Sequence, residues 1–234
     1  MIRLGVTGTD TGVGKTVVAC ALATALARRG LSVAAMKPVE SGVSFDDPDR
    51  DGARLARAAG DRRPLSITAP ITFADPVAPL VASRRERRPV DLERLDASMR
   101  ETAGGHDVLL VEGAGGLLVP ITERVSYDAL FARWSLDLVV VAVNRLGVIN
   151  QVRLTLAAAR SAGIKPRVVV LNNLFTTPPD TSIGDNARII AELERVPVCE
   201  LPWLPQLDDL QQAADAAEHS GLVELSAPSM PKPV

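Results

Sequence analysis

The sequence predicts an α/β fold, a mostly parallel β-sheet flanked by helices on both faces. Short apolar runs typical of buried strands alternate with helical patterns along the 234 residues. Parallel neighbours in a sheet need crossover connections, which such helices supply. Apolar residues make up 47% of the chain and aromatic residues only 3%, a composition typical of α/β proteins rather than of disordered chains.

The individual elements follow from these patterns. Strands are expected at the apolar runs 2–6, 32–36, 108–111, 138–143, 167–171 and, more weakly marked, 198–201. Helices are expected at 15–29, 51–59, 92–103, 127–134, 148–162, 186–195 and 207–218. Gly30 and Gly163 follow two of these helices, where glycine commonly ends a helix. Ligands bind beyond the carboxyl ends of strands in such sheets, so functional loops are expected after Val6, Met36, Val111 and Leu171.

Length and charge bound the function classes. The chain fits one domain, expected at 1–226, with a short Pro-rich tail at 227–234. A net charge of -2 gives no reason to expect nucleic acid as a partner, and the basic run 84–88 is interpreted as a solvated face. No apolar run approaches the ~20 residues that span a bilayer, nor resembles a signal peptide. A cytoplasmic location without membrane contact is therefore expected.

Cysteine and histidine usage narrows the kinds of metal site. Cys20 and Cys199 lie far apart without metal-ligand spacing, so both are expected to be ordinary core residues. With only His106 and His219 in the chain, a zinc site or a His-based triad is disfavoured. Any metal is expected to be held by oxygen ligands.

The stretch GTDTGVGKT, residues 8–16, leaves the first apolar run and enters the first predicted helix. Gly12 and Gly14 allow backbone N–H groups to turn around an anion at the positive end of that helix. Lys15 adds a charge for terminal phosphates, and the Thr16 hydroxyl is placed to hold magnesium. A plain glycine turn explains the glycines but not the Lys-Thr pair. The outer glycines lie one residue further apart than in the ordinary phosphate loop.

The stretch VLLVEGAGG, residues 108–116, puts Glu112 at the end of an apolar strand, where a carboxylate can complete a magnesium shell. The glycines at 113, 115 and 116 let the backbone approach a ligand, which weakens the alternative that Glu112 only caps the next segment. Asp51, in DRDGARLA, is a further candidate oxygen ligand. It is equally a common acid at a helix start, and both interpretations stay open.

The stretch MKPVESG, residues 36–42, favours an enzyme over a simple nucleotide binder. Lys37 stands at a strand end before a proline that fixes the chain, so its side chain is expected in the crevice. There it can neutralise a transferring phosphoryl group or a bound carboxylate-like group, with Ser41 donating a hydrogen bond beside it. The alternative is an ordinary surface lysine.

Taken together, these segments resemble the dethiobiotin synthetase family, the ATP-dependent carboxylating ligases of biotin synthesis. GTDTGVGKT, KPVESG, VEGAGG and ELPWLP occur in the family's order, and the longer phosphate loop is the form that family uses. LGVIN at 146–150 resembles its segment at a helix start, and TFADPVAPLVA at 72–82 resembles its Pro-bearing substrate loop. The resemblance implies a P-loop NTPase-like fold and a homodimer.

The resemblance also implies a reaction. The family converts 7,8-diaminononanoate (7,8-diaminopelargonate), CO2 and MgATP to dethiobiotin, ADP and phosphate. One amine captures CO2 as a carbamate, ATP phosphorylates the carbamate, and the second amine displaces phosphate to close a cyclic urea. Two anions have to be brought together, so Lys15, Lys37 and magnesium are expected to converge, while Thr11 and Ser41 orient the carbamate.

The family's site residues, carried onto this sequence, form three sets. The implied magnesium ligands are Thr16, Asp51 and Glu112. ATP is implied over Gly12, Val13, Gly14, Lys15, Thr16 and Val17, beside Gly113, Ala114 and Gly115, with adenine at Asn172, Asn173, Pro202, Trp203 and Leu204. The substrate is implied at Ser41, with its distal carboxylate, across the dimer, at Gly147, Val148, Ile149 and Asn150. The chain departs from the family where members often carry an acidic residue at position 173 and some a tyrosine near Asn186.

Two rivals remain within the same fold class. A P-loop ATPase that acts as a dimerising switch usually carries a second lysine early in its loop, where this chain has Asp10 and Thr11. An amide-forming synthetase of cobalamin precursors normally carries a further glutaminase domain, for which 234 residues leave no room. Both are weaker matches than the ligase.

Overall fold

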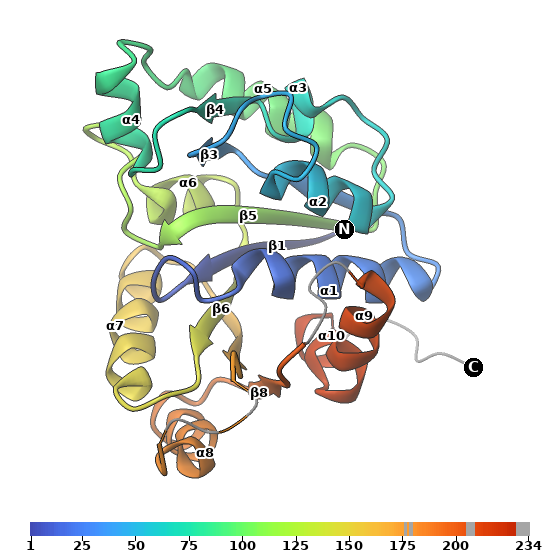
Figure 1. Cartoon of the computed structure of the whole chain (residues 1–234), viewed down its shortest axis with the longest axis vertical. Helices are drawn as coiled ribbons and strands as arrows, with labels where there is room; N and C mark the ends of the chain where they lie inside the picture. The colour runs from blue at the N-terminus through green and yellow to red at the C-terminus, as the bar shows by residue number, and fades with distance from the viewer. Residues whose placement is uncertain (176, 178–179, 205–208, 228–234) are drawn as a thin grey trace.

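The computed structural model describes residues 1–175, 177, 180–204 and 209–227, and is built on a six-stranded sheet (Figure 1). The strand order is β2-β5-β1-β6-β7-β8, and every neighbouring pair is parallel. The strands are β1 (Ile2–Gly8), β2 (Val33–Met36), β5 (Val108–Gly116), β6 (Asp137–Val143), β7 (Pro166–Asn172) and β8 (Val198–Leu201). The predicted α/β fold with a mostly parallel sheet is confirmed.

Helices cover both faces of this sheet. One apolar cluster joins it to α1 (Lys15–Arg28), α2 (Asp51–Ala59), α9 (Leu210–His219) and α10 (Leu222–Ser226). A second cluster, on the other face, includes residues of α4 (Pro79–Arg85), α5 (Leu92–Ala103), α6 (Tyr127–Arg133), α7 (Val148–Ser161) and α8 (Ile183–Glu194). Because side chains alternate along a strand, Leu110 lies in the first cluster and its neighbour Leu109 in the second.

A small second sheet lies beside the main one. It pairs β3 (Val39–Ser41) in parallel with β4 (Ile71–Phe73), which follows the short helix α3 (Leu65–Thr68). This sheet fixes the chain just after Lys37, because β3 begins two residues beyond that lysine. The sequence did not predict β3, β4, α3, α4 or α10, which are too short for a clear periodic pattern.

Several predicted boundaries were wrong. The strand expected at 108–111 runs on to Gly116, because β1 continues to pair with it, with Val6 opposite Glu112 and Gly8 opposite Gly116. The helix expected at 186–195 begins three residues earlier, at Ile183. The helix expected at 207–218 is observed as Leu210–His219, and residues 205–208 lie outside the described part. Of the tail expected at 227–234, only Ala227 is described.

Two other expectations concern single side chains and membrane spans. Cys20 and Cys199 are both buried and unlinked, which confirms them as core residues. Within the described ranges, no helix is both long and apolar enough to cross a membrane.

Candidate active site

The loop between β1 and α1 has the backbone geometry of an anion-binding turn. Gly12 and Gly14 have φ angles of 76° and 91°, a region that favours glycine. A Cβ atom on Gly14 would lie 2.1 Å from the side-chain nitrogen of Asn172, which itself donates to the carbonyl of Val13 at 3.0 Å. The loop is thus supported from behind by the end of β7. Its N–H groups and the first turn of α1 are left to face a ligand.

Lys15 folds back over this loop. Its Nζ donates to the carbonyl of Asp10 at 3.0 Å, and the residue is largely buried. Burial lowers the pKa of Lys15, and the nearby Lys37 lowers it further. Two cations held this close repel each other, so the arrangement favours an anion between them.

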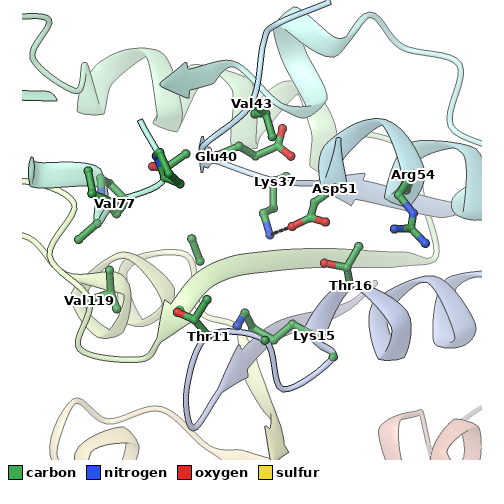
Figure 2. A pocket seen from close by; sticks show the side chains of 18 of the residues that line it. Thr11, Lys15, Thr16, Lys37, Glu40, Val43, Asp51, Arg54, Val77 and Val119 are labelled. Carbon is green, nitrogen blue, oxygen red and sulfur yellow. Dashed lines mark hydrogen bonds and ion pairs between the residues drawn. The ribbon is translucent and has the colours of Figure 1, made fainter. Parts of the chain in front are cut away.

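The second cation, Lys37, is buried and contacts two carboxylates in a charged cluster, and Figure 2 shows its contact with one of them, Asp51. The other carboxylate, Glu112, is fully buried, whereas the side chain of Asp51 is 44% exposed. The Lys37 Nζ lies 2.5 Å from Oε1 of Glu112 and 3.1 Å from Oδ2 of Asp51, and it also donates to the carbonyl of Gly113. Thr16, at the start of α1, donates to the same Oε1 at 2.8 Å. The segments after β1 and β2, the strand β5 and the helix α2 therefore meet at one point.

The cluster sets the protonation of its members. Burial acts to lower the pKa of Lys37, but Glu112 and Asp51 outweigh it and raise that pKa, so the ammonium stays charged. For Asp51, burial is likewise outweighed by Lys37 and by the Thr16 hydrogen bond, and the pKa is lowered. Burial raises the pKa of Glu112 more than Lys37 lowers it. Oε2 of Glu112 is buried and has no hydrogen-bond partner among the described residues.

A cavity of about 550 Å³ lies between the phosphate loop and this cluster. That volume is in the range of small-molecule sites. Its walls combine the loop and α1, the Lys37 and β3 segment, the start of α2, and the Pro76 to Pro79 segment. Lys15, Lys37, Glu40 and Asp51 line it, a charge pattern that suits a phosphorylated ligand with an associated cation. Glu112 is fully buried and does not line it.

Comparison with known proteins decides the family. A family described as an AAA domain matches residues 3–211. The ATP-dependent dethiobiotin synthetase of Anaeromyxobacter dehalogenans strain 2CP-C is 45% identical over 209 residues, covering 88% of this chain and 92% of its own. That of Aquifex aeolicus is 36% identical over 207 residues, covering 88% and 91%. The chain belongs to the ATP-dependent dethiobiotin synthetase family.

Solved structures place this synthetase among P-loop NTPase folds. MinD of Pyrococcus horikoshii, solved with Mg-ADP, is 17% identical with a TM-score of 0.57, covering 97% of this chain and 93% of its own. MinD of Aquifex aeolicus is 14% identical with a TM-score of 0.56, covering 100% and 98%. Such identities show the fold alone. The sequence-based assignments of family, P-loop fold and enzyme class, an ATP-dependent ligase, are confirmed, and so is the carboxylation and ring closure that forms dethiobiotin in biotin synthesis.

Most residues predicted to act on phosphate and carbamate line the cavity: Thr11, Gly12, Gly14, Lys15, Thr16, Val17, Lys37, Ser41, Asp51, Ala114 and Gly115. Val13, Glu112 and Gly113, which were predicted with them, do not line it. The hydroxyl oxygen of Ser41 is buried and unpartnered within the described ranges. The two interpretations left open for Asp51 are both compatible with its place, since it begins α2 and contacts Lys37.

Other predicted site residues of the synthetase lie outside that cavity. The predicted adenine positions lie at the end of β7 or just after β7 and β8, where the backbone N–H of Asn173 donates to Leu201. Trp203 is exposed and Leu204 lies in the core. At the start of α7, Gly147 has a φ of 92°, but the Val148 side chain is fully buried and its N–H donates to Arg145. Val148 therefore has no group left for a ligand.

Sequence reasoning missed four lining residues: Glu40, Val43, Arg54 and Val119. Arg54 could have been found, since it lies three residues after Asp51 on a helix and such residues share a face. Glu40 carried no such signal, because a carboxylate in a three-residue strand looks like a surface residue. The single tyrosine, Tyr127, is fully buried against Phe131 and donates to the Val39 carbonyl, so it belongs to the core.

Proposed function

We propose that the cavity brings the terminal phosphate of ATP and a substrate carbamate together, with magnesium on Thr16, Asp51 and Glu112. The observation that carries this proposal is the buried Lys37 ammonium, 2.5 Å from Glu112 and 3.1 Å from Asp51, facing the phosphate loop. The Lys37 ammonium is the positive charge that balances the carboxylates of Glu112 and Asp51 at this point. The same carboxylates and the Thr16 hydroxyl offer the hard oxygen ligands that magnesium prefers.

The donor set fits magnesium in one particular way. Oε2 of Glu112 is buried without a partner in the described part of the chain, so it has a free ligating position. Among the described residues no group of three or more His, Cys, Asp or Glu side chains could hold a metal alone. Magnesium usually keeps ligands from substrate phosphates and water, and this set of two carboxylates and one hydroxyl suits that habit. Bound magnesium would supply charge neutralisation at the phosphate oxygens.

The chain's own residues then have separate tasks. The N–H groups of the loop from Gly12 to Val17 hold the phosphates, and Lys15 neutralises their charge. Lys37 lines the same cavity as the loop, so it would stabilise the charge shared by the carbamate and the terminal phosphate. Ser41 and Thr11 orient the carbamate with their hydroxyl groups. Holding the two reactants in contact is the main contribution of such a site.

The nucleotide base and the ends of the chain complete the proposal. Asn173, with residues 202–204, takes the adenine, because an amide can pair with a donor and an acceptor. Asn172, whose side-chain nitrogen already donates to the Val13 carbonyl, offers the base only its side-chain oxygen. One domain spans 1–226. The cytoplasmic location expected from the sequence stays a prediction.

The synthetase is proposed to act as a homodimer through α7. A second cavity, of about 440 Å³, shares Thr11 and Val119 with the first and extends toward Leu154 on α7. Leu118, Leu146 and Leu154 expose 61%, 75% and 64% of their surface, an apolar area that suits burial against a second copy. The first turn of α7, with Ile149 and Asn150, would then hold the substrate's distal carboxylate for the partner.

The dimer has a simple test. L154E should shift the protein from dimer to monomer, as measured by light scattering after size exclusion, and should raise the KM for the diamine. L193E is the control, because Leu193 is comparably exposed but lies on α8. A wild-type protein that is monomeric at every concentration would overturn the shared site.

The magnesium site is tested by calorimetry with ADP. D51N and E112Q should bind ADP as wild type does in EDTA but lose the gain in affinity that magnesium gives. An unchanged magnesium effect in both variants would remove Asp51 and Glu112 from the proposed ligands. It would leave the capping and helix-start interpretations for these two residues.

A further inference from the structure

The first turn of α2 is held by a buried ion pair next to the active site. Arg50, directly before Asp51, has a fully buried side chain, and its Nη1 lies 2.7 Å from Oε2 of Glu40, which is 3% exposed. Both terminal nitrogens also lie 3.4 Å from the carbonyl of Ala69, and the ring of Phe45 lies 4.8 Å from the guanidinium carbon. The pair joins β3 to the residue that begins α2.

Glu40 holds α2 a second time through the backbone. Its Oε1 accepts the N–H of Gly52 at 2.8 Å, one residue beyond Asp51. Gly52 is packed so closely that an added Cβ would lie 2.5 Å from Cβ of Ala69 and 3.3 Å from Cβ of Lys37. Asp51 is therefore fixed from both sides, by the side chain of Arg50 before it and the N–H of Gly52 after it.

The pair also links the two segments that supply the charged cluster. Glu40 lies three residues after Lys37, and Arg50 lies one residue before Asp51. A displacement of α2 away from β3 would draw Asp51 away from Lys37, whose 3.1 Å contact requires both segments in place. The pair thus acts on the geometry of the site, while Arg50 is fully buried.

Stability alone is a weak explanation for this pair. Removing two charges from water is unfavourable, and an apolar pair of similar volume is often as stable or more so. Burial acts to raise the pKa of Glu40, against the Gly52 N–H, Lys37 and Arg50, which shows how poorly this position suits a carboxylate without its partners. The charges offer directional bonds that an apolar pair lacks.

We propose that the Glu40–Arg50 ion pair is a positioning device that fixes Asp51 for cation binding. Glu40 and Arg50 act through Asp51, and this inference rests on the proposed magnesium role of Asp51. Residues that orient metal ligands typically change metal affinity by about 10- to 100-fold when they are replaced.

The chain offers a matched control at the other end of α2. Asp61 follows that helix, accepts the backbone N–H of Ala35 and pairs with Arg63, which donates to the carbonyls of Glu101 and Thr102. This pair also ties α2 to the sheet, but it lies away from the cavity. D61N/R63M therefore removes a comparable tie without touching Asp51.

The test compares E40Q/R50M, which removes both charges, with D61N/R63M in the full-length synthetase. Calorimetry measures ADP affinity in EDTA and with magnesium, and steady-state assays give kcat and the half-saturating magnesium concentration. For E40Q/R50M we expect ADP affinity in EDTA to stay near wild type, while the half-saturating magnesium concentration rises about 10-fold or more. D61N/R63M should lower the melting temperature and leave the magnesium dependence unchanged.

Two further variants keep the result interpretable. R50K retains the charge and should recover most of the magnesium affinity, so it is the conservative control. E40Q alone removes the charge at Glu40 but keeps an acceptor for the Gly52 N–H, so it replaces the double variant if that does not fold. An unchanged magnesium dependence in E40Q/R50M, with D51N strongly affected, would overturn the positioning role only. An unchanged dependence in D51N would overturn the proposed metal site as well.

Discussion

Replacing Lys37 by methionine tests the charged cluster most sharply. K37M keeps the length of the side chain but removes the ammonium that contacts the fully buried Glu112 at 2.5 Å. Breaking a buried ion pair by removing one partner costs about 3–5 kcal/mol, because the remaining charge is uncompensated. For a chain of this length that corresponds to a melting temperature lower by roughly 6–20 °C.

The assay is thermal and urea unfolding in EDTA, with two companion measurements. K37M/E112Q removes both charges and should regain most of the lost stability, since no buried charge is left alone. Mg-ADP should stabilise K37M more than wild type, because a bound cation would again balance Glu112. Turnover should be lost in both variants. An unfolding midpoint of K37M equal to wild type, or no recovery in K37M/E112Q, would refute the reasoning.

Three further predictions concern single positions. G14A should weaken ADP binding more than G12A, because both have positive φ angles but only the methyl group on Gly14 would meet Asn172; equal affinities in calorimetry would contradict this. S41A should leave the unfolding free energy within about 0.5 kcal/mol of wild type, because the Ser41 hydroxyl has no partner among the described residues. Its kcat should fall about 100-fold, and an unchanged kcat would contradict the role of Ser41 in orienting the carbamate. The pKa of Asp51 is lowered in the folded state, so its stabilising effect is present at neutral pH and is lost as pH falls through that lowered pKa. In an acid titration, D51N should therefore lose less stability than wild type between about pH 5 and pH 2. Parallel stability curves for the two proteins would contradict this.

The main sheet could be predicted because buried parallel strands are continuous apolar runs. The end of β5 could not be predicted, because Glu112 and the glycines after it have the composition of a loop. Only the pairing of Gly8 with Gly116 shows that the strand continues. β3 and β4 are three residues each and depend on pairing with one another across the 29 residues between Ser41 and Ile71. Such elements carry no periodic signal of their own.

The residues of the site could be predicted from the sequence where they belong to short motifs of recognisable chemistry. Lys15, Thr16, Lys37 and Glu112 were each singled out by residue type at a strand end or helix start, and the structure brings them together. The sequence could not show that Lys37 pairs with the carboxylates. Nor could it show that Asn172 supports the phosphate loop, because both contacts join distant segments.

The Glu40–Arg50 pair could not be predicted from the sequence either. Its members are ten residues apart, and neither fits a motif for a site. Only the packing of β3 against α2 reveals that the pair encloses Asp51. A buried charge of this kind is found from the structure, where its partners and its exposure can be measured.

The central claim is that this site uses ATP to activate a carbamate. The most direct measurement follows ADP, phosphate and dethiobiotin together, by coupled assay and mass spectrometry, with purified protein, MgATP, 7,8-diaminononanoate and bicarbonate. We expect one ADP and one phosphate for each dethiobiotin, and almost no ATP turnover when either the diamine or bicarbonate is left out. ATP hydrolysis at the same rate without the diamine would contradict this claim.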